Sequence, residues 1–112
     1  MGFDAGLLDR RITLQTAAPV QSASGEQTFD WAHAVSQDLW AQWLPAGTRE
    51  AWQAQERLAS YVDGVFRMYD LAPRPAPEAC RILFDGRVFD IKPYIEIGRR
   101  EGLEIPVVAR GE

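Results

Sequence analysis

Apolar side chains recur at every second position through most of this 112-residue chain. A period of two is typical of strands with one buried face, because successive side chains of a strand point to opposite sides. The runs with this pattern begin near Ile12, Phe29, Leu39, Tyr61, Ile82, Val88 and Leu103. We therefore expect a mainly β protein of six to seven short antiparallel strands. As a single domain over residues 1–112, it closes into a small β-barrel or folds into a sandwich.

One segment, from about Arg49 to Leu58, has a helical pattern instead. Thr48 can cap this helix, since its hydroxyl can accept a hydrogen bond from an otherwise unpaired backbone amide. Ala51, Ala54 and Leu58 then lie along one side of the helix. We expect one short helix between the third and fourth strands, stabilised by packing on the sheet.

Turn-forming residues separate the predicted strands. Asp85-Gly86 lies between two apolar runs and predicts a two-residue hairpin turn, because both of its central positions need positive φ. The polar residues 19–27 predict a long exposed loop, and the proline-rich residues 71–78 predict an extended linker. Pro106 predicts that the last strand lies at a sheet edge, because proline cannot donate to a strand ladder.

The charge balance argues against a site that grips nucleic acid. Sixteen acidic and twelve basic residues give a net charge of −4, whereas binding to phosphates usually needs a basic patch. The pairs Arg10-Arg11 and Arg99-Arg100 are isolated, and each has an acid beside it. The N-terminal part holds no long apolar run, so we expect neither a signal peptide nor a membrane span. Synthesis in a cytoplasm is the expectation that follows.

The residues that carry most catalytic and metal chemistry are scarce. Cys80 lies in an apolar run and is predicted to be a buried small hydrophobe. His33 is the single histidine, with Asp30 and Asp38 nearby, but no nucleophile-elbow pattern accompanies it, so we interpret it as a half-buried structural histidine. The serines that could join it in a triad are Ser22, Ser24 and Ser36. We expect a protein that is not an enzyme, with no catalytic residue, cofactor or metal.

Trp40 and Trp43 differ in parity, so a regular strand would point them to opposite faces. One of them can fill the core while the other faces outward. An outward tryptophan on a soluble acidic protein indicates a protein contact surface, and packing beneath the helix is the equal alternative.

The order of these features resembles the head–tail joining family of long-tailed double-stranded-DNA phages, also called head-closure or stopper proteins. The resemblance covers nearly the whole chain. It is carried by residues 6–15, Gly25-Glu26, Trp31, residues 39–42, Glu50, Phe66-Arg67 and residues 84–91. Gene transfer agents, which are domesticated phage-like particles, use the same kind of protein, so the resemblance extends to them.

This resemblance implies a structural role in the neck of a virion or virus-like particle. The subunits would form a homo-oligomeric ring, hexameric or dodecameric, between the portal and adaptor ring above and the tail-terminator ring below. The ring would retain packaged DNA, continue the DNA channel without sequence-specific binding, and dock the tail. Two alternatives stay open: an adaptor or tail-completion subunit of the same particle, or a cellular barrel that binds a ligand or peptide. An apolar cavity open to solvent would favour the cellular barrel, and a filled interior would count against it.

Candidate contacts with partners or with the channel lie in three places. The residues are Gln21, Ser22, Ser24, Gly25 and Glu26 in the loop, Trp40 on a strand, and Arg74, Arg99 and Arg100 in later connections. The loop is expected to project along the ring axis or into the channel, or to be an ordinary flexible loop. The segment 71–78 is expected to be a plain linker or to contact a neighbouring ring.

Overall fold

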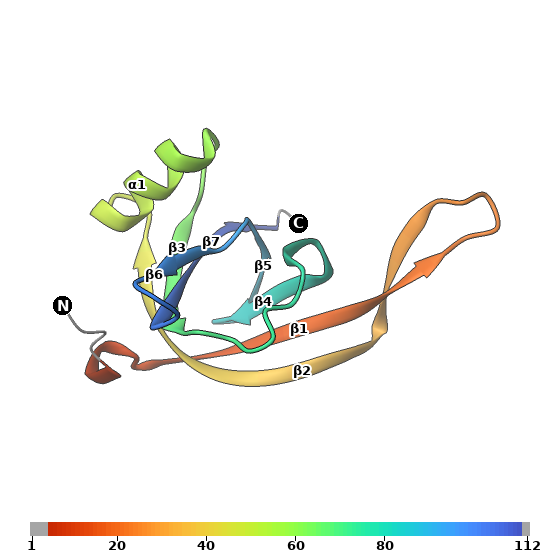
Figure 1. The fold of residues 1–112 in the computed structure, drawn as a ribbon, viewed down its shortest axis with the longest axis horizontal. Helices are drawn as coiled ribbons and strands as arrows, with labels where there is room; N and C mark the ends of the chain where they lie inside the picture. Colours follow the sequence, from red (N-terminus) through yellow and green to blue (C-terminus); the bar gives the residue numbers. More distant parts are fainter. Residues whose placement is uncertain (1–4, 111–112) are drawn as a thin grey trace.

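Seven antiparallel strands and one α-helix make up residues 5–110, the part of the chain that the computed structural model describes (Figure 1). The first strands are long: β1 spans Arg10–Gln21 and β2 spans Gln27–Pro45. The remaining elements are α1 (Arg49–Leu58), β3 (Gly64–Tyr69), β4 (Cys80–Phe84), β5 (Arg87–Ile91), β6 (Ile95–Ile97) and β7 (Gly102–Ala109). Short 3-10 helices lie at Ala5–Leu7 and Pro77–Ala79. No helix within residues 5–110 is long and apolar enough to cross a membrane.

The strands close on themselves. Their order is β3-β2-β1-β4-β5-β7, and β3 also pairs with β7, which joins the two ends of the sheet. The edge of β7 that faces away from β3 pairs with two strands: β6 pairs with residues 102–104 and β5 pairs with residues 107–109. The result is an uneven, barrel-like ring of antiparallel strands (Figure 1). The prediction of a small mainly β barrel is confirmed.

Side chains fill the interior of the barrel. Trp43 packs on Phe66, with ring centres 4.6 Å apart, and also on Phe84 and Phe89 at 5.7 and 5.6 Å. The buried residues around these aromatic rings are Ile12, Leu14, Ala41, Met68, Cys80, Ile82, Ile91, Leu103, Ile105 and Val107. Aromatic pairs at these distances add to the stability that burial provides.

Helix α1 packs on the outside of the barrel and begins where the sequence predicts. The Ala51 N–H donates a 3.3 Å hydrogen bond to Thr48 Oγ1, which caps the helix. Ala51 and Ala54 are buried against Val62 and Val65, so β3 is covered by the helix on one face and by the barrel core on the other. Burial on both faces explains why Val65 and Phe66, which point to opposite sides of the strand, are both fully buried.

The first half of the chain differs from its predicted division. The two strands expected near Phe29 and Leu39 are one 19-residue strand, β2, so α1 follows the second strand rather than the third. The predicted loop over residues 19–27 is shorter than expected, because residues 19–21 and 27 are strand and only residues 22–26 form the turn. Backbone pairing across this hairpin, between residues 19–21 and 27–29, holds them extended although their side chains carry no period of two.

Beyond the barrel, β1 and β2 continue as a two-stranded ribbon. The pairing of β1 with β4 ends at Thr16, and the register between β1 and β2 shifts between Thr16 and Ala18. Past this irregularity the ribbon projects away from the barrel, at the end of the molecule opposite α1 (Figure 1). We call the projecting residues 18–30 the arm.

Two predictions about turns and edges have opposite outcomes. Asp85 and Gly86 have φ of 53° and 74°, which confirms the two-residue hairpin turn between β4 and β5. Pro106, however, lies inside the sheet, where β7 has strand partners on both sides. Its carbonyl accepts a 2.8 Å hydrogen bond from the Lys92 N–H in the gap between β5 and β6. In an antiparallel strand the N–H and the carbonyl of one residue point to the same side. The position of the N–H that Pro106 lacks therefore faces this gap, and no hydrogen bond between β7 and β3 is lost.

Candidate functional site

The candidate contact residues of the predicted loop lie together at the tip of the arm. Backbone hydrogen bonds from Ser22 N–H to the Glu26 carbonyl (2.8 Å) and from Gly25 N–H to the Ser22 carbonyl (2.9 Å) close the turn. The Gln21 amide donates to the Gly25 carbonyl at 3.3 Å, and Ser22 and Ser24 share a hydrogen bond of 2.9 Å. All five residues are exposed. The arm therefore presents a compact polar tip at one end of the long axis of the molecule (Figure 1).

The arm holds no Lys or Arg, and neither do the parts of β1 and β2 between Arg11 and Pro45 that carry it. Between Arg11 and Arg49 the sequence contains no Lys or Arg, and its carboxylates there are Glu26, Asp30 and Asp38. This part of the surface has a negative character at neutral pH, which disfavours close approach of phosphates.

His33 lies on the same ribbon and is the reverse of the half-buried residue that we predicted. Its side chain is 84% exposed, and its Nδ1 lies 2.7 Å from Asp30 Oδ2. This hydrogen bond lowers the pKa of Asp30. The exposure coincides with the register shift, since residues 31–34 of β2 lie between the paired positions Asp30 and Val35, where the ladder to β1 is interrupted.

Other chemical groups lie apart from His33. Ser36 shares a hydrogen bond with Gln15 at 3.3 Å, while Ser22 and Ser24 are bonded to each other. Cys80 is buried, as predicted, with its Sγ 3.4 Å from Thr16 Oγ1, and burial raises the pKa of the thiol. Within residues 5–110 no three His, Cys, Asp or Glu side chains lie close enough to hold a metal ion.

Trp40 faces outward, and Trp43 faces the barrel interior, as the parity of the two residues predicts. Trp40 is 53% exposed, and the Arg11 guanidinium lies 5.0 Å from its ring centre. A cation at that distance over an indole ring is attracted by the electrons of the ring. Of the two readings weighed for an outward tryptophan, the structure supports a surface position rather than packing beneath the helix.

Beside Trp40 the barrel wall opens into a hollow of about 360 Å³. It lies where β2 and β3 separate, because the two strands pair only from Gln42 to Pro45 of β2. The residues that line it are Gln37, Asp38, Leu39 and Trp40 of β2 and Met68, Tyr69, Asp70, Leu71 and Ala72 at and after the end of β3. We call this hollow the notch.

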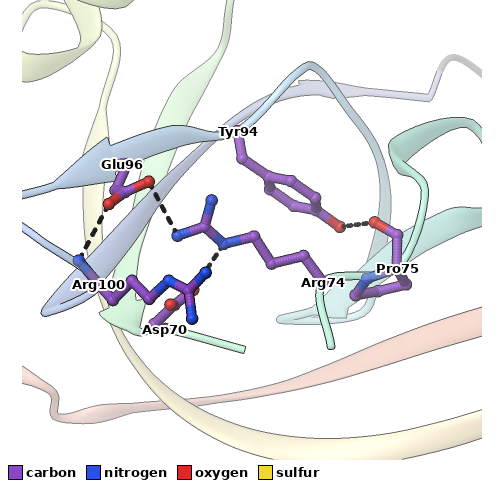
Figure 2. A network of polar contacts seen from close by, with 6 residues as sticks. All are labelled: Asp70, Arg74, Pro75, Tyr94, Glu96 and Arg100. Atoms are coloured by element: carbon purple, nitrogen blue, oxygen red, sulfur yellow. Dashed lines mark hydrogen bonds and ion pairs between the residues drawn. The ribbon is translucent and has the colours of Figure 1, made fainter. Parts of the chain in front are cut away.

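A second hollow of about 350 Å³ adjoins the notch, and the structure brings two predicted contact residues to it. Arg74 and Arg100 both line it, although they are 26 positions apart in the sequence. Figure 2 shows Arg74 between two carboxylates: its Nε donates to Asp70 at 2.7 Å, and its Nη2 lies 3.3 Å from Glu96. The Arg100 backbone N–H donates to Glu96 at 3.0 Å.

These contacts fix the proline-rich segment against β6 and the turn that follows it. The hydrogen bond from Arg74 holds the pKa of Asp70 below its ordinary value, and the charge of Arg100 contributes to the same shift. Tyr94 adds a hydrogen bond from its hydroxyl to the Pro75 carbonyl at 2.7 Å (Figure 2). Residues 71–76 have no regular secondary structure, whereas Pro77 and Glu78 begin a short 3-10 helix, so the prediction of an extended linker over residues 71–78 holds only in part. The segment is tied to the barrel by the Arg74 side chain and by the hydrogen bond from Tyr94.

Sequence reasoning placed these contacts only in part. It selected Trp40, Arg74 and Arg100 one by one and missed Asp70 and Leu71, which line both hollows. An Asp four residues before an Arg is the one local signal that could have linked Asp70 to Arg74. Arg99, also selected, is exposed in the turn after β6 and does not line either hollow.

Comparison with known proteins gives one family and two similar folds. Residues 3–110 match the family described as phage head completion protein. The chain is similar to protein SF1141 of Shigella flexneri 2a, with 24% identity, 98% of this chain and 99% of that chain covered, and a TM-score of 0.65. It is also similar to a chain from the virion of a native gene transfer agent particle, with 21% identity, coverage of 89% and 92%, and a TM-score of 0.62. At these identities the two structures show a shared fold. No curated protein matches the chain.

Proposed function

The chain belongs to the phage head completion protein family, a family of structural virion proteins, and we propose that it is the head-closure, or stopper, subunit of the neck. In this proposal the 112 residues form one head–tail joining domain, made in the cytoplasm of a host bacterium. Copies of it form a ring below the portal and adaptor and above the tail terminator. The ring retains packaged DNA, continues the channel and docks the tail.

The match over residues 3–110 is the observation that carries this proposal, because it includes the barrel, the arm and the helix. The packing of the barrel agrees with a mechanical role. Phe66 and Phe89 are 0% and 1% exposed at its centre, together with the Trp43 ring. A barrel filled in this way has no interior space for a small ligand, which counts against the cellular ligand-binding alternative.

The arm is the element that we place nearest to the DNA. Because no Lys or Arg occurs between Arg11 and Arg49, an arm in the channel would not grip phosphates and would not slow the passage of DNA. All five candidate contact residues at the polar tip are exposed: Gln21, Ser22, Ser24, Gly25 and Glu26. We place Trp40, Arg74, Arg99 and Arg100 on the surfaces that meet neighbouring rings.

Deletion of the gene in the producing strain, followed by negative-stain electron microscopy of the lysate, tests the proposal. The expected result is full-length tails and separate heads that have lost their DNA. Heads that keep their DNA beside incomplete tails would assign the protein to tail completion instead. Normal particles that still deliver DNA would refute a neck role altogether.

A second strain separates the role of the arm from that of the barrel. In this variant Asn-Gly replaces residues 19–29, which joins Ala18 to its register partner Asp30 through a two-residue turn. The barrel keeps all its strands, so tails are expected to attach while DNA retention falls. Full retention of DNA by the shortened variant would refute the placement of the arm in the channel.

A further inference from the structure

The arm leaves the barrel at a break in the ladder between β1 and β2. Between the paired positions Thr16 and Ala18, the single residue Ala17 of β1 faces four residues of β2, 31–34. The pairing of β1 with β4 also ends at Thr16, and β2 turns sharply at this place (Figure 1). A two-stranded ribbon is only marginally stable by itself, and extra residues on one strand bend it. Backbone pairing alone therefore does not fix the direction of the arm.

A row of polar side chains crosses the outer face of the barrel just before this break. Ser36 of β2, Gln15 of β1 and Arg81 of β4 are register partners on three neighbouring strands. The Arg81 Nε donates a 2.7 Å hydrogen bond to Gln15 Oε1, and the Gln15 amide donates to Ser36 Oγ at 3.3 Å. Asp90 is the partner of Arg81 on β5, but it forms its ion pair with Arg110. The hydrogen bond uses the edge of the Arg81 guanidinium, so its flat face can contact an aromatic ring.

Trp31, on the arm side of the break, makes this contact. Arg81 Cζ lies 4.4 Å from the centre of the Trp31 ring, and a cation over an indole is attracted by the electrons of the ring. Trp31 also lies beside Phe29 of the arm, with ring centres 6.4 Å apart. Both rings are half-buried, whereas Ala32 and His33 next to them are exposed. Side chains thus connect the arm to the barrel across the place where the backbone ladder is interrupted.

From the interrupted ladder and these contacts, we propose that the arm pivots at residues 31–34 and that Arg81 and Trp31 form a latch that fixes its direction. With the latch closed, the arm projects away from the barrel, as Figure 1 shows. With the latch open, the arm swings as one body. It keeps its own hairpin, because the pairs of residues 18–21 with residues 27–30 all lie beyond the pivot.

Residual dipolar couplings of the full-length, nitrogen-15-labelled protein test the latch, because swinging of the arm relative to the barrel averages them. In the wild type we expect one alignment tensor to fit the barrel and residues 18–30 together. Arg81→Met keeps an unbranched side chain and removes the charge. In this variant we expect unchanged couplings in the barrel and couplings of residues 18–30 that shrink by a common factor. Trp31→Leu is expected to give the same result, since it opens the latch from the other side.

Matched variants separate the latch from a general loss of stability. Arg87→Met makes the same change at an arginine that lies 5.3 Å from the Phe89 ring on the β4–β5 hairpin, and it is expected to leave the couplings of the arm unchanged. The double variant Arg81→Met/Trp31→Leu is expected to reduce these couplings no further than either single variant, because both changes open the same contact. Arg81→Lys keeps the charge but loses the planar group that Gln15 holds, so its couplings are expected to be intermediate.

Several outcomes would overturn the inference. Arm couplings that are already reduced in the wild type would show that no latch holds the arm. Unchanged couplings in both Arg81→Met and Trp31→Leu would show that the backbone fixes the direction of the arm. Losses that add in the double variant would mean that the two side chains act separately. Carbon-13 chemical shifts of a random coil at residues 18–30 would mean that the arm has unfolded instead of pivoting. The measurement uses the purified chain, so its failure is distinct from a failure of the gene-deletion test.

Discussion

Gly64 begins β3 at a place where the barrel has no room for a side chain. A Cβ built on it would lie 2.4 Å from Trp43 Cη2 and 2.8 Å from the Leu44 carbonyl oxygen. Both distances are shorter than real Cβ contacts. The neighbours cannot easily move, because Trp43 packs on Phe66 at 4.6 Å and Leu44 belongs to the β2–β3 ladder. Gly64→Ala is therefore expected to destabilise the barrel, although alanine is a better strand residue than glycine.

The expected loss of stability in Gly64→Ala follows from the atoms that the added methyl group must displace. Overpacking a well-filled core by one methyl group costs about 1–3 kcal/mol, and the rigid indole ring and a backbone oxygen put Gly64→Ala at about 2–3 kcal/mol. For a domain near 100 residues, a loss of about 2 kcal/mol lowers Tm by roughly 8–10 °C. Urea unfolding followed by tryptophan fluorescence measures the change in the free energy of unfolding.

A double-mutant cycle with Trp43→Phe tests the stated cause. Phenylalanine removes the outer ring atoms that a Cβ at position 64 would meet, at a cost of about 1–2 kcal/mol as a large-to-small change. Because the clash with the indole ring then disappears and only the contact with the Leu44 carbonyl oxygen remains, the double variant is expected to be at least about 1 kcal/mol more stable than the sum of the single effects predicts. Effects that add to within about 0.5 kcal/mol, or a Gly64→Ala variant as stable as the wild type, would refute the steric reasoning.

Three further predictions concern single groups. Thr48→Ala removes the cap of α1 and is expected to cost about 1 kcal/mol in urea unfolding, whereas Thr48→Ser keeps the hydroxyl and most of the stability. Arg74→Gln removes the hydrogen bond that lowers the pKa of Asp70, so carbon-13 NMR is expected to find that pKa closer to its ordinary value. Because the pKa of Asp70 is lower in the folded than in the unfolded chain, the ionised carboxylate stabilises the fold above about pH 4. This stabilisation is lost as the pH falls through the pKa of the folded chain. The loss of stability at acid pH is expected to be smaller in Arg74→Gln. Cys80 is expected to react with iodoacetamide at pH 8 far more slowly in buffer than in urea, because the folded chain buries the thiol and raises its pKa; equal rates in the two solvents would contradict this.

The features that were predicted correctly are set by neighbours in the sequence. The Thr48 cap precedes a helix of the expected length, and the Asp85-Gly86 turn has both positive φ values. Each depends on a few consecutive residues whose conformational preferences agree. The opposite orientations of Trp40 and Trp43 follow in the same way from the period of a strand.

The features that were missed depend on pairing between separate segments, whether across a hairpin or far apart in the chain. Residues 19–21 are strand because residues 27–29 pair with them, and nothing in their own side chains indicates it. Pro106 is tolerated in the middle of the sheet because of a local gap between β5 and β6, and a single sequence does not reveal such a gap. The notch likewise arises where β2 and β3 separate, so its residues are adjacent only after the barrel has formed.

The pairing of β7 with three other strands has a consequence for how the protein is made. Residues 102–109 supply Leu103, Ile105 and Val107 to the core and close the ring between β3 and β5. Every element that they join is synthesised earlier, so the barrel cannot close while β7 is still absent from a growing chain. Until then β3 and β5 have open edges and their core side chains are uncovered, a condition that promotes aggregation. Folding is thus expected to be late and cooperative, with long-range pairings that slow it to the millisecond-to-second range of other β-barrels.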